Sequence, residues 1–62
     1  MKFNCLFINK RTNERKIKEF TKAEIDKYFG EYVTDRAIDR GETNTTIMKK
    51  GDAYKVQIKY LK

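Results

Sequence analysis

Apolar and polar residues along the chain follow two different periods, and each period predicts a different kind of element. Four segments have the alternation, or the β-branched and aromatic content, of β-strands. They are residues 2–9, 14–20, 42–48 and 53–61. The polar residues 10–13 and 49–52 predict turns, the second with Gly51 at a position suited to positive φ. The pattern therefore predicts two antiparallel hairpins, residues 2–20 and 42–61.

The segment between the hairpins begins with two start signals of a helix. Thr21 and Glu24 have the spacing of a capping box, in which the Thr21 side chain accepts a hydrogen bond from the amide of Glu24. Phe20 and Ile25 have the spacing of the hydrophobic staple that accompanies such a cap. Together these signals predict one helix over residues 22–40.

One face of this predicted helix is apolar, with a 3.6-residue period. Its members are Ile25, Tyr28, Phe29, Tyr32 and Val33. The apolar stripe fades afterwards, because Arg36 lies on the same face and Ile38 on the opposite one. Gly41 is a suitable C-terminal stop. Either the last turns of the helix overhang the sheet, or the helix ends before Gly41.

Two hairpins joined by one helix predict an α+β fold of ββαββ type, a four-stranded mixed sheet with the helix packed across one face. Residues 2–9 and 53–61 are the most apolar strands, so they belong in the middle of the sheet, where burial is greatest. The strand order is then 2-1-4-3, with the two central strands parallel. This arrangement resembles the β-grasp architecture of small immunoglobulin-binding bacterial domains. All 62 residues are expected to form a single domain.

The first strand is apolar on both faces, whereas the helix can cover only one. If residue 9 faces residue 14 across the first hairpin, Phe3, Cys5 and Phe7 point toward the helix. A register shifted by one residue would exchange the two faces. In the unshifted register, with residue 9 opposite residue 14, the outer face holds Leu6, Ile8, Ile17, Lys55, Gln57, Lys59 and Leu61. An apolar centre on an open sheet face indicates a surface that binds a partner.

Few residues are available for catalysis. The chain has no histidine and a single cysteine, Cys5, so it lacks an internal disulfide and the usual zinc ligands. It has no phosphate-binding glycine loop and no paired-carboxylate motif. We therefore expect no enzymatic activity, no cofactor and no metal, with Cys5 as a small core residue. No apolar run suits a signal peptide or a membrane span, so we expect a cytoplasmic protein, in a bacterial host if it is phage-encoded.

The first functional hypothesis is a protein-binding regulator or inhibitor of phage or mobile-element type. It would block a protein partner sterically through the outer sheet face or through an acidic flank of the helix formed by Glu24, Glu31 and Asp35. A homodimer through the outer sheet face is a variant of the same hypothesis. The second hypothesis is a small basic module that binds DNA or RNA, because the formal net charge is +6. Its candidate contacts are Lys10, Arg11, Arg15, Lys16, Lys18, Lys49, Lys50, Lys55 and Lys59.

Three features favour a protein partner over nucleic acid by a small margin. Nine acidic residues are interleaved with fifteen basic ones. Only four residues are arginines, which disfavours base-specific contacts. Parallel central strands would also place the two basic hairpin loops at opposite ends of the sheet, with only an elongated basic strip between them.

Overall fold

The computed structural model describes residues 1–61, which fold into one sheet and two helices. The elements are β1 (Lys2–Asn9), β2 (Arg15–Thr21), α1 (Lys22–Phe29), α2 (Glu31–Arg40), β3 (Glu42–Lys49) and β4 (Asp52–Leu61). The strand order β2-β1-β4-β3 confirms the predicted order. The register of the first hairpin is also as predicted, with Ile8 opposite Arg15 and the amide of Asn9 bonded to the carbonyl of Glu14.

The predicted single helix is in fact two helices, separated by Gly30. The start is as predicted, since Thr21 accepts from the amide of Glu24 and the Glu24 carboxylate accepts from the amide of Thr21. α1 ends after eight residues because Gly30 has φ 96° and ψ 154°, a conformation nearly exclusive to glycine. The chain turns there, and the hydroxyl of Thr34 in α2 donates a hydrogen bond back to Asp26 in α1. The helical region ends at Gly41, which has the left-handed conformation of a C-cap, so of the two alternatives the earlier end is excluded.

This turn changes the direction of the second hairpin. One helix over residues 22–40 would be about 28 Å long and would carry the chain from one end of the sheet to the other. Two packed helices of eight and ten residues instead return the chain to the end where β2 finishes. β4 therefore runs antiparallel to β1, with Phe3 opposite Tyr60 and Asn9 opposite Tyr54. The predicted parallel central pair is wrong, the sheet is fully antiparallel rather than mixed, and the arrangement is not β-grasp.

The core lies where the helices cover the sheet. Six hydrophobic side chains are fully buried, and they come from the two central strands and from both helices. They are Phe3, Cys5, Ile25, Ala37, Val56 and Ile58. Phe3 and Cys5 thus point toward the helices, as predicted. Burial raises the pKa of the Cys5 thiol to about 11, so the thiol is neutral at physiological pH and behaves as a small apolar side chain.

The break at Gly30 also shifts which helix residues are buried. Thr34 and Ala37 are fully buried and Ile38 packs against the core. Tyr28 and Tyr32, predicted to be buried, are 59% and 71% exposed. The predicted apolar face is wrong for these two tyrosines and for Ile38. For Tyr32 and Ile38 the reason is that a period counted through Gly30 ignores the change of direction between α1 and α2. Tyr28 precedes Gly30 and lies on the exposed side of α1.

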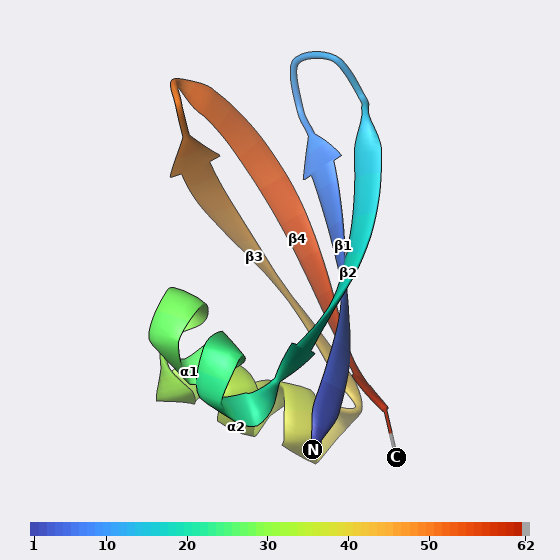
Figure 1. The fold of residues 1–62 in the computed structure, drawn as a ribbon, viewed down its shortest axis with the longest axis vertical. Coiled ribbons are helices and arrows are strands. Elements are labelled where there is room, and N and C mark those ends of the chain that lie inside the picture. Colours follow the sequence, from blue (N-terminus) through green and yellow to red (C-terminus); the bar gives the residue numbers. More distant parts are fainter. Residues whose placement is uncertain (62) are drawn as a thin grey trace.

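The two helices cover only one end of the sheet (Figure 1). α1 and α2 are about 12 and 15 Å long, whereas a ten-residue strand such as β4 is about 30 Å long. Both hairpin loops project from the other end, side by side and beyond the helices (Figure 1). The prediction that the loops lie at opposite ends is therefore wrong. The half of the sheet nearer the loops has no helix over it.

Candidate functional site

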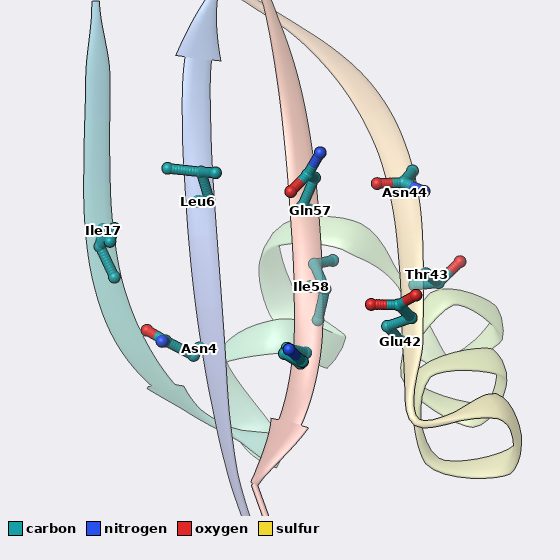
Figure 2. Close-up of a pocket in the computed structure, with 9 residues that line it drawn as sticks. Asn4, Leu6, Ile17, Glu42, Thr43, Asn44, Gln57 and Ile58 are labelled. Atoms are coloured by element: carbon teal, nitrogen blue, oxygen red, sulfur yellow. The ribbon is translucent and has the colours of Figure 1, made fainter.

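The outer face of the sheet carries a shallow hollow of about 460 Å³ (Figure 2). Leu6 lies at its centre, paired with Ile17 of β2 on one side and Gln57 of β4 on the other. Ile17 is 66% exposed. The hollow, hereafter the outer hollow, is lined by Asn4, Leu6, Ile17, Glu42, Thr43, Asn44, Gln57, Ile58 and Lys59. Amide, acidic and basic groups surround its small apolar centre.

The opposite, inner face carries a larger hollow of about 720 Å³ where the helices end. Five of its lining side chains are aromatic and three are lysines. This hollow, hereafter the aromatic groove, is lined by Phe7, Lys16, Lys18, Phe20, Tyr28, Phe29, Ile47, Met48, Lys49 and Tyr54. The groove runs from the C-terminal end of α1 to the second hairpin loop.

The aromatic side chains form a continuous series at the helix end of the groove. The rings of Phe7 and Phe20 are 6.1 Å apart in an edge-to-face arrangement, and Phe7 lies 6.4 Å from Phe29. Phe20 in turn lies 5.8 Å from Tyr28. The rings of Phe7, Phe20 and Phe29 are partly buried, so packing holds them in place. The ring of Tyr28, at one end of the series, is exposed to solvent.

Lysines lie on both edges of this aromatic floor. Lys16 and Lys18 belong to β2, at one edge of the sheet, and Lys49 belongs to β3, at the other. Lys16 pairs with Phe7, and Phe7 pairs with Val56 of β4. Four adjacent strands place the two edges about 14 Å apart. The groove therefore has an apolar centre between two positively charged margins.

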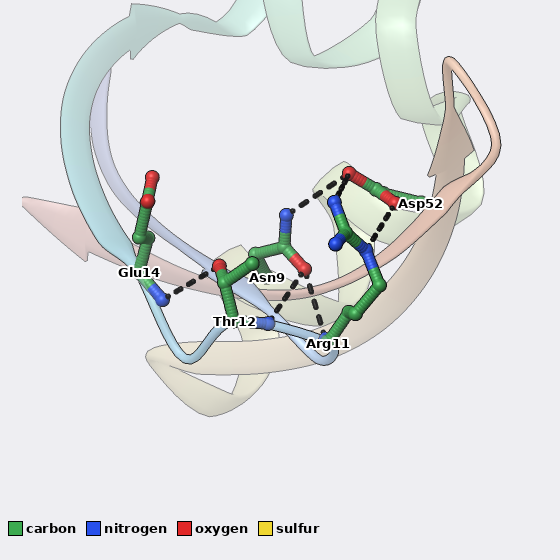
Figure 3. Close-up of polar contacts among 5 residues, drawn as sticks. All are labelled: Asn9, Arg11, Thr12, Glu14 and Asp52. Atoms are coloured by element: carbon green, nitrogen blue, oxygen red, sulfur yellow. Dashed lines mark hydrogen bonds and ion pairs between the residues drawn. The ribbon is translucent and has the colours of Figure 1, made fainter.

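A polar cluster joins the two hairpin loops (Figure 3). Nε and Nη2 of Arg11 donate to the two carboxylate oxygens of Asp52, at 2.9 and 3.1 Å. Asn9, only 6% exposed, donates to Asp52 at 3.2 Å and accepts from the amides of Arg11 and Thr12. The amide of Lys10 donates to the carbonyl of Ala53. This loop clamp, Asn9 with Arg11 and Asp52, fixes the two loops relative to each other.

The loop clamp predicts an acid-sensitive contribution to stability. Arg11, and to a lesser degree Asn9, lowers the pKa of Asp52. A carboxylate whose folded-state pKa is lowered stabilises the fold above its unfolded pKa near 3.8, and this contribution is lost as the pH falls through the folded value. Asp52→Asn should therefore melt below wild type at pH 7, with the difference in melting temperature narrowing toward pH 2. The control is Asp39→Asn, because Asp39 is exposed and forms no ion pair with another of residues 1–61. A difference in melting temperature between Asp52→Asn and wild type that does not change with pH would contradict the prediction.

The charge of the protein is concentrated at the loop end of the sheet. Cys5 pairs with Lys18 and with Ile58, and Ile58 pairs with Thr43, so segments 5–18 and 43–58 make up this end. They contain eight Lys and Arg residues and two Asp and Glu residues. Their formal net charge of +6 equals that of the whole chain. The rest of the chain holds seven basic and seven acidic residues, so the fold separates a basic half from a half with no net charge.

The structure divides the predicted basic residues into three groups. Lys16, Lys18 and Lys49 line the aromatic groove. Lys10, Arg11 and Lys50 lie in the two loops, and Arg11 forms an ion pair with Asp52. The remaining three, which alternate onto the outer face, are Arg15, Lys55 and Lys59. The predicted protein-binding residues Leu6, Ile8, Ile17, Lys55, Gln57, Lys59 and Leu61 all share that outer face.

Sequence reasoning missed the aromatic groove as a surface. It assigned Phe7, Tyr28 and Phe29 to a core covered by one long helix, whereas Phe7 and Phe29 pack against the core but are only partly buried, and Tyr28 is exposed. The signal that would have revealed the groove is Gly30 in the middle of the helical segment, since a glycine there both weakens a helix and permits a turn.

No known protein family, curated protein or solved structure matches this chain. Among residues 1–61, no three His, Cys, Asp or Glu side chains gather where they could hold a metal ion. In the same part of the chain, no helix is long and apolar enough to cross a membrane. A functional proposal therefore depends on the shape and charge of the two hollows.

Proposed function

We propose that this protein is a small non-enzymatic module that binds nucleic acid at the loop end of its sheet, through phosphate contacts from the margins of the aromatic groove. The observation that carries the proposal is the concentration of the entire formal net charge of +6 at that end. A local excess of positive charge attracts a polyanion and releases its counterions on binding. The antiparallel central strands bring the two basic loops together, which removes one of the reasons for favouring a protein partner.

The type of basic residue at this end suits phosphate rather than base recognition. Six of the eight basic residues in segments 5–18 and 43–58 are lysines. Lysine acts as a point charge that contacts phosphates without reading base edges. Arg11, one of the two arginines there, donates to Asp52 through Nε and Nη2. We therefore propose binding that tolerates any sequence.

A salt titration tests this function. Contacts from Lys16, Lys18, Lys49 and one loop lysine to a single strand give a slope of about −2 to −3 for log K against log salt concentration. The affinity for a labelled oligonucleotide of about 12 nucleotides should then fall roughly 20- to 50-fold between 50 and 200 mM salt. Fluorescence anisotropy measures this directly. Absence of binding to both single-stranded and duplex oligonucleotides at the lower salt concentration would refute the proposal.

The outer hollow supports a second candidate function, a protein-binding regulator that acts by steric occlusion. The observation in its favour is the exposed Ile17 beside Leu6 on a face with no other element over it. Its apolar area is small and amide and charged groups surround it, as in the interface of a transient complex.

A double substitution separates this second candidate from the first. Leu6→Lys with Ile8→Lys places two charges on the outer face, where both side chains are only partly buried. We expect the fold and the affinity for oligonucleotides to be retained, and any protein binding or self-association through that face to be lost. Far-UV circular dichroism, sedimentation and anisotropy measure the three properties. Unfolding of the double variant would contradict the assignment of these residues to the outer face.

A further inference from the structure

We infer that the aromatic groove takes unpaired bases, so that the nucleic acid bound there is single-stranded and its bases stack on aromatic rings. This inference rests on the proposed function, since it names the form of nucleic acid that occupies the same site. Phosphate contacts alone would require only the lysines. The groove also offers five aromatic side chains beside those lysines. Proteins that hold single strands without sequence preference combine a basic track with such rings.

Tyr28 is the ring best placed to receive a base. It is 59% exposed, although it lines the groove and contacts Phe20 at a ring separation of 5.8 Å. The ammonium group of Lys27 lies 5.8 Å from the Tyr28 ring centroid, so a cation is available for the phosphate of a nucleotide whose base stacks there. A tyrosine so exposed gives the fold little burial energy, whereas it gives a base a flat partner.

Duplex nucleic acid suits this arrangement poorly. Paired bases are already stacked on their neighbours, so they cannot contact rings on the floor of a groove between lysine margins. An unpaired strand can turn its bases toward Phe7, Tyr28 and Tyr54 while its phosphates lie against Lys16, Lys18 and Lys49. The apolar centre and the charged margins are then both occupied by one ligand.

The test compares two labelled strands of about 12 nucleotides that carry the same charge, oligo(dT) and an abasic deoxyribose-phosphate strand. Each stacked base contributes enough that we expect oligo(dT) to bind at least roughly 10-fold more tightly. Tyr28→Ala should reduce the affinity for oligo(dT) by roughly 10-fold and leave the affinity for the abasic strand unchanged. Tyr28→Phe should restore stacking. Tyr32→Ala is the matched control, because Tyr32 is 71% exposed on α2, pairs with Arg36 and does not line the groove.

The outcomes distinguish the inference from the function on which it rests. Equal affinity for the two strands, or an equal loss of affinity for both strands in Tyr28→Ala, would overturn base stacking and leave phosphate binding intact. Binding of neither strand at low salt would overturn the proposed function itself. A difference between the strands that disappears in Tyr28→Ala and persists in Tyr32→Ala would establish the inference.

Discussion

Replacing Lys16, Lys18 and Lys49 together by glutamine is expected to lower the affinity for a single-stranded oligonucleotide on the order of 100-fold at about 0.1 M salt. Each lost phosphate contact should reduce the salt slope by about 0.7, so the slope falls by about 2. All three side chains are exposed at the edges of the groove, and none of them forms an ion pair with another of residues 1–61. The fold should therefore be retained. Anisotropy titrations at several salt concentrations measure both the affinity and the slope.

A matched triple variant on the other face separates the groove from charge in general. Arg15→Gln, Lys55→Gln and Lys59→Gln remove the same charge from the same sheet, but these side chains alternate onto the outer face. We expect this variant to lose much less affinity than the groove variant. Equal losses would mean that the whole molecule attracts the polyanion and that the groove is not its binding site.

Gly30→Ala is expected to destabilise the protein by about 1–3 kcal/mol, because φ 96° and ψ 154° are strained for any residue with a β-carbon. No atom lies within 4 Å of an added β-carbon, so the cost arises from the backbone and not from a clash. A domain of 62 residues has a total stability of roughly 3–9 kcal/mol. The substitution therefore removes a large share of it. Urea denaturation followed by circular dichroism measures the change.

Asp35→Ala is the control for Gly30→Ala, since it introduces the same residue at an exposed position within α2. It should change the free energy of unfolding by no more than about 0.5 kcal/mol. A Gly30→Ala variant that is as stable as wild type and gains helix signal would contradict the account. It would mean that a continuous helix fits this fold and that Gly30 does not determine the topology.

The strands and their faces could be predicted from the sequence because both depend on local alternation, and the strand order could be predicted because the two most apolar strands occupy the middle of the sheet. The inward placement of Phe3 and Cys5 and the pairing of Leu6 with Ile17 follow from the period of two and the length of the first turn. The capping box at Thr21 is equally local. Such features depend on neighbours in the chain, which the sequence displays directly.

The direction of the second hairpin could not be predicted in the same way, because it depends on one backbone angle. An apolar period that continues from Ile25 to Val33 favours a straight helix, and the effect of Gly30 on that helix is set by tertiary packing. Burial of Thr34 and Ala37 against the sheet stabilises the bent arrangement. The exposure of the aromatic groove, and the meeting of the basic loops, both follow from that bend.

Side-chain NMR signals recorded during titration with oligo(dT) show whether nucleic acid binds in the aromatic groove. Amide signals would report both faces of a strand, whereas ring and methyl signals report one. Binding in the groove should change the signals of the ring protons of Phe7, Tyr28 and Tyr54 and leave those of the methyl groups of Leu6 and Ile17 unaffected. Changes confined to those methyl groups on the outer face, or no change at any side chain at low salt, would contradict it.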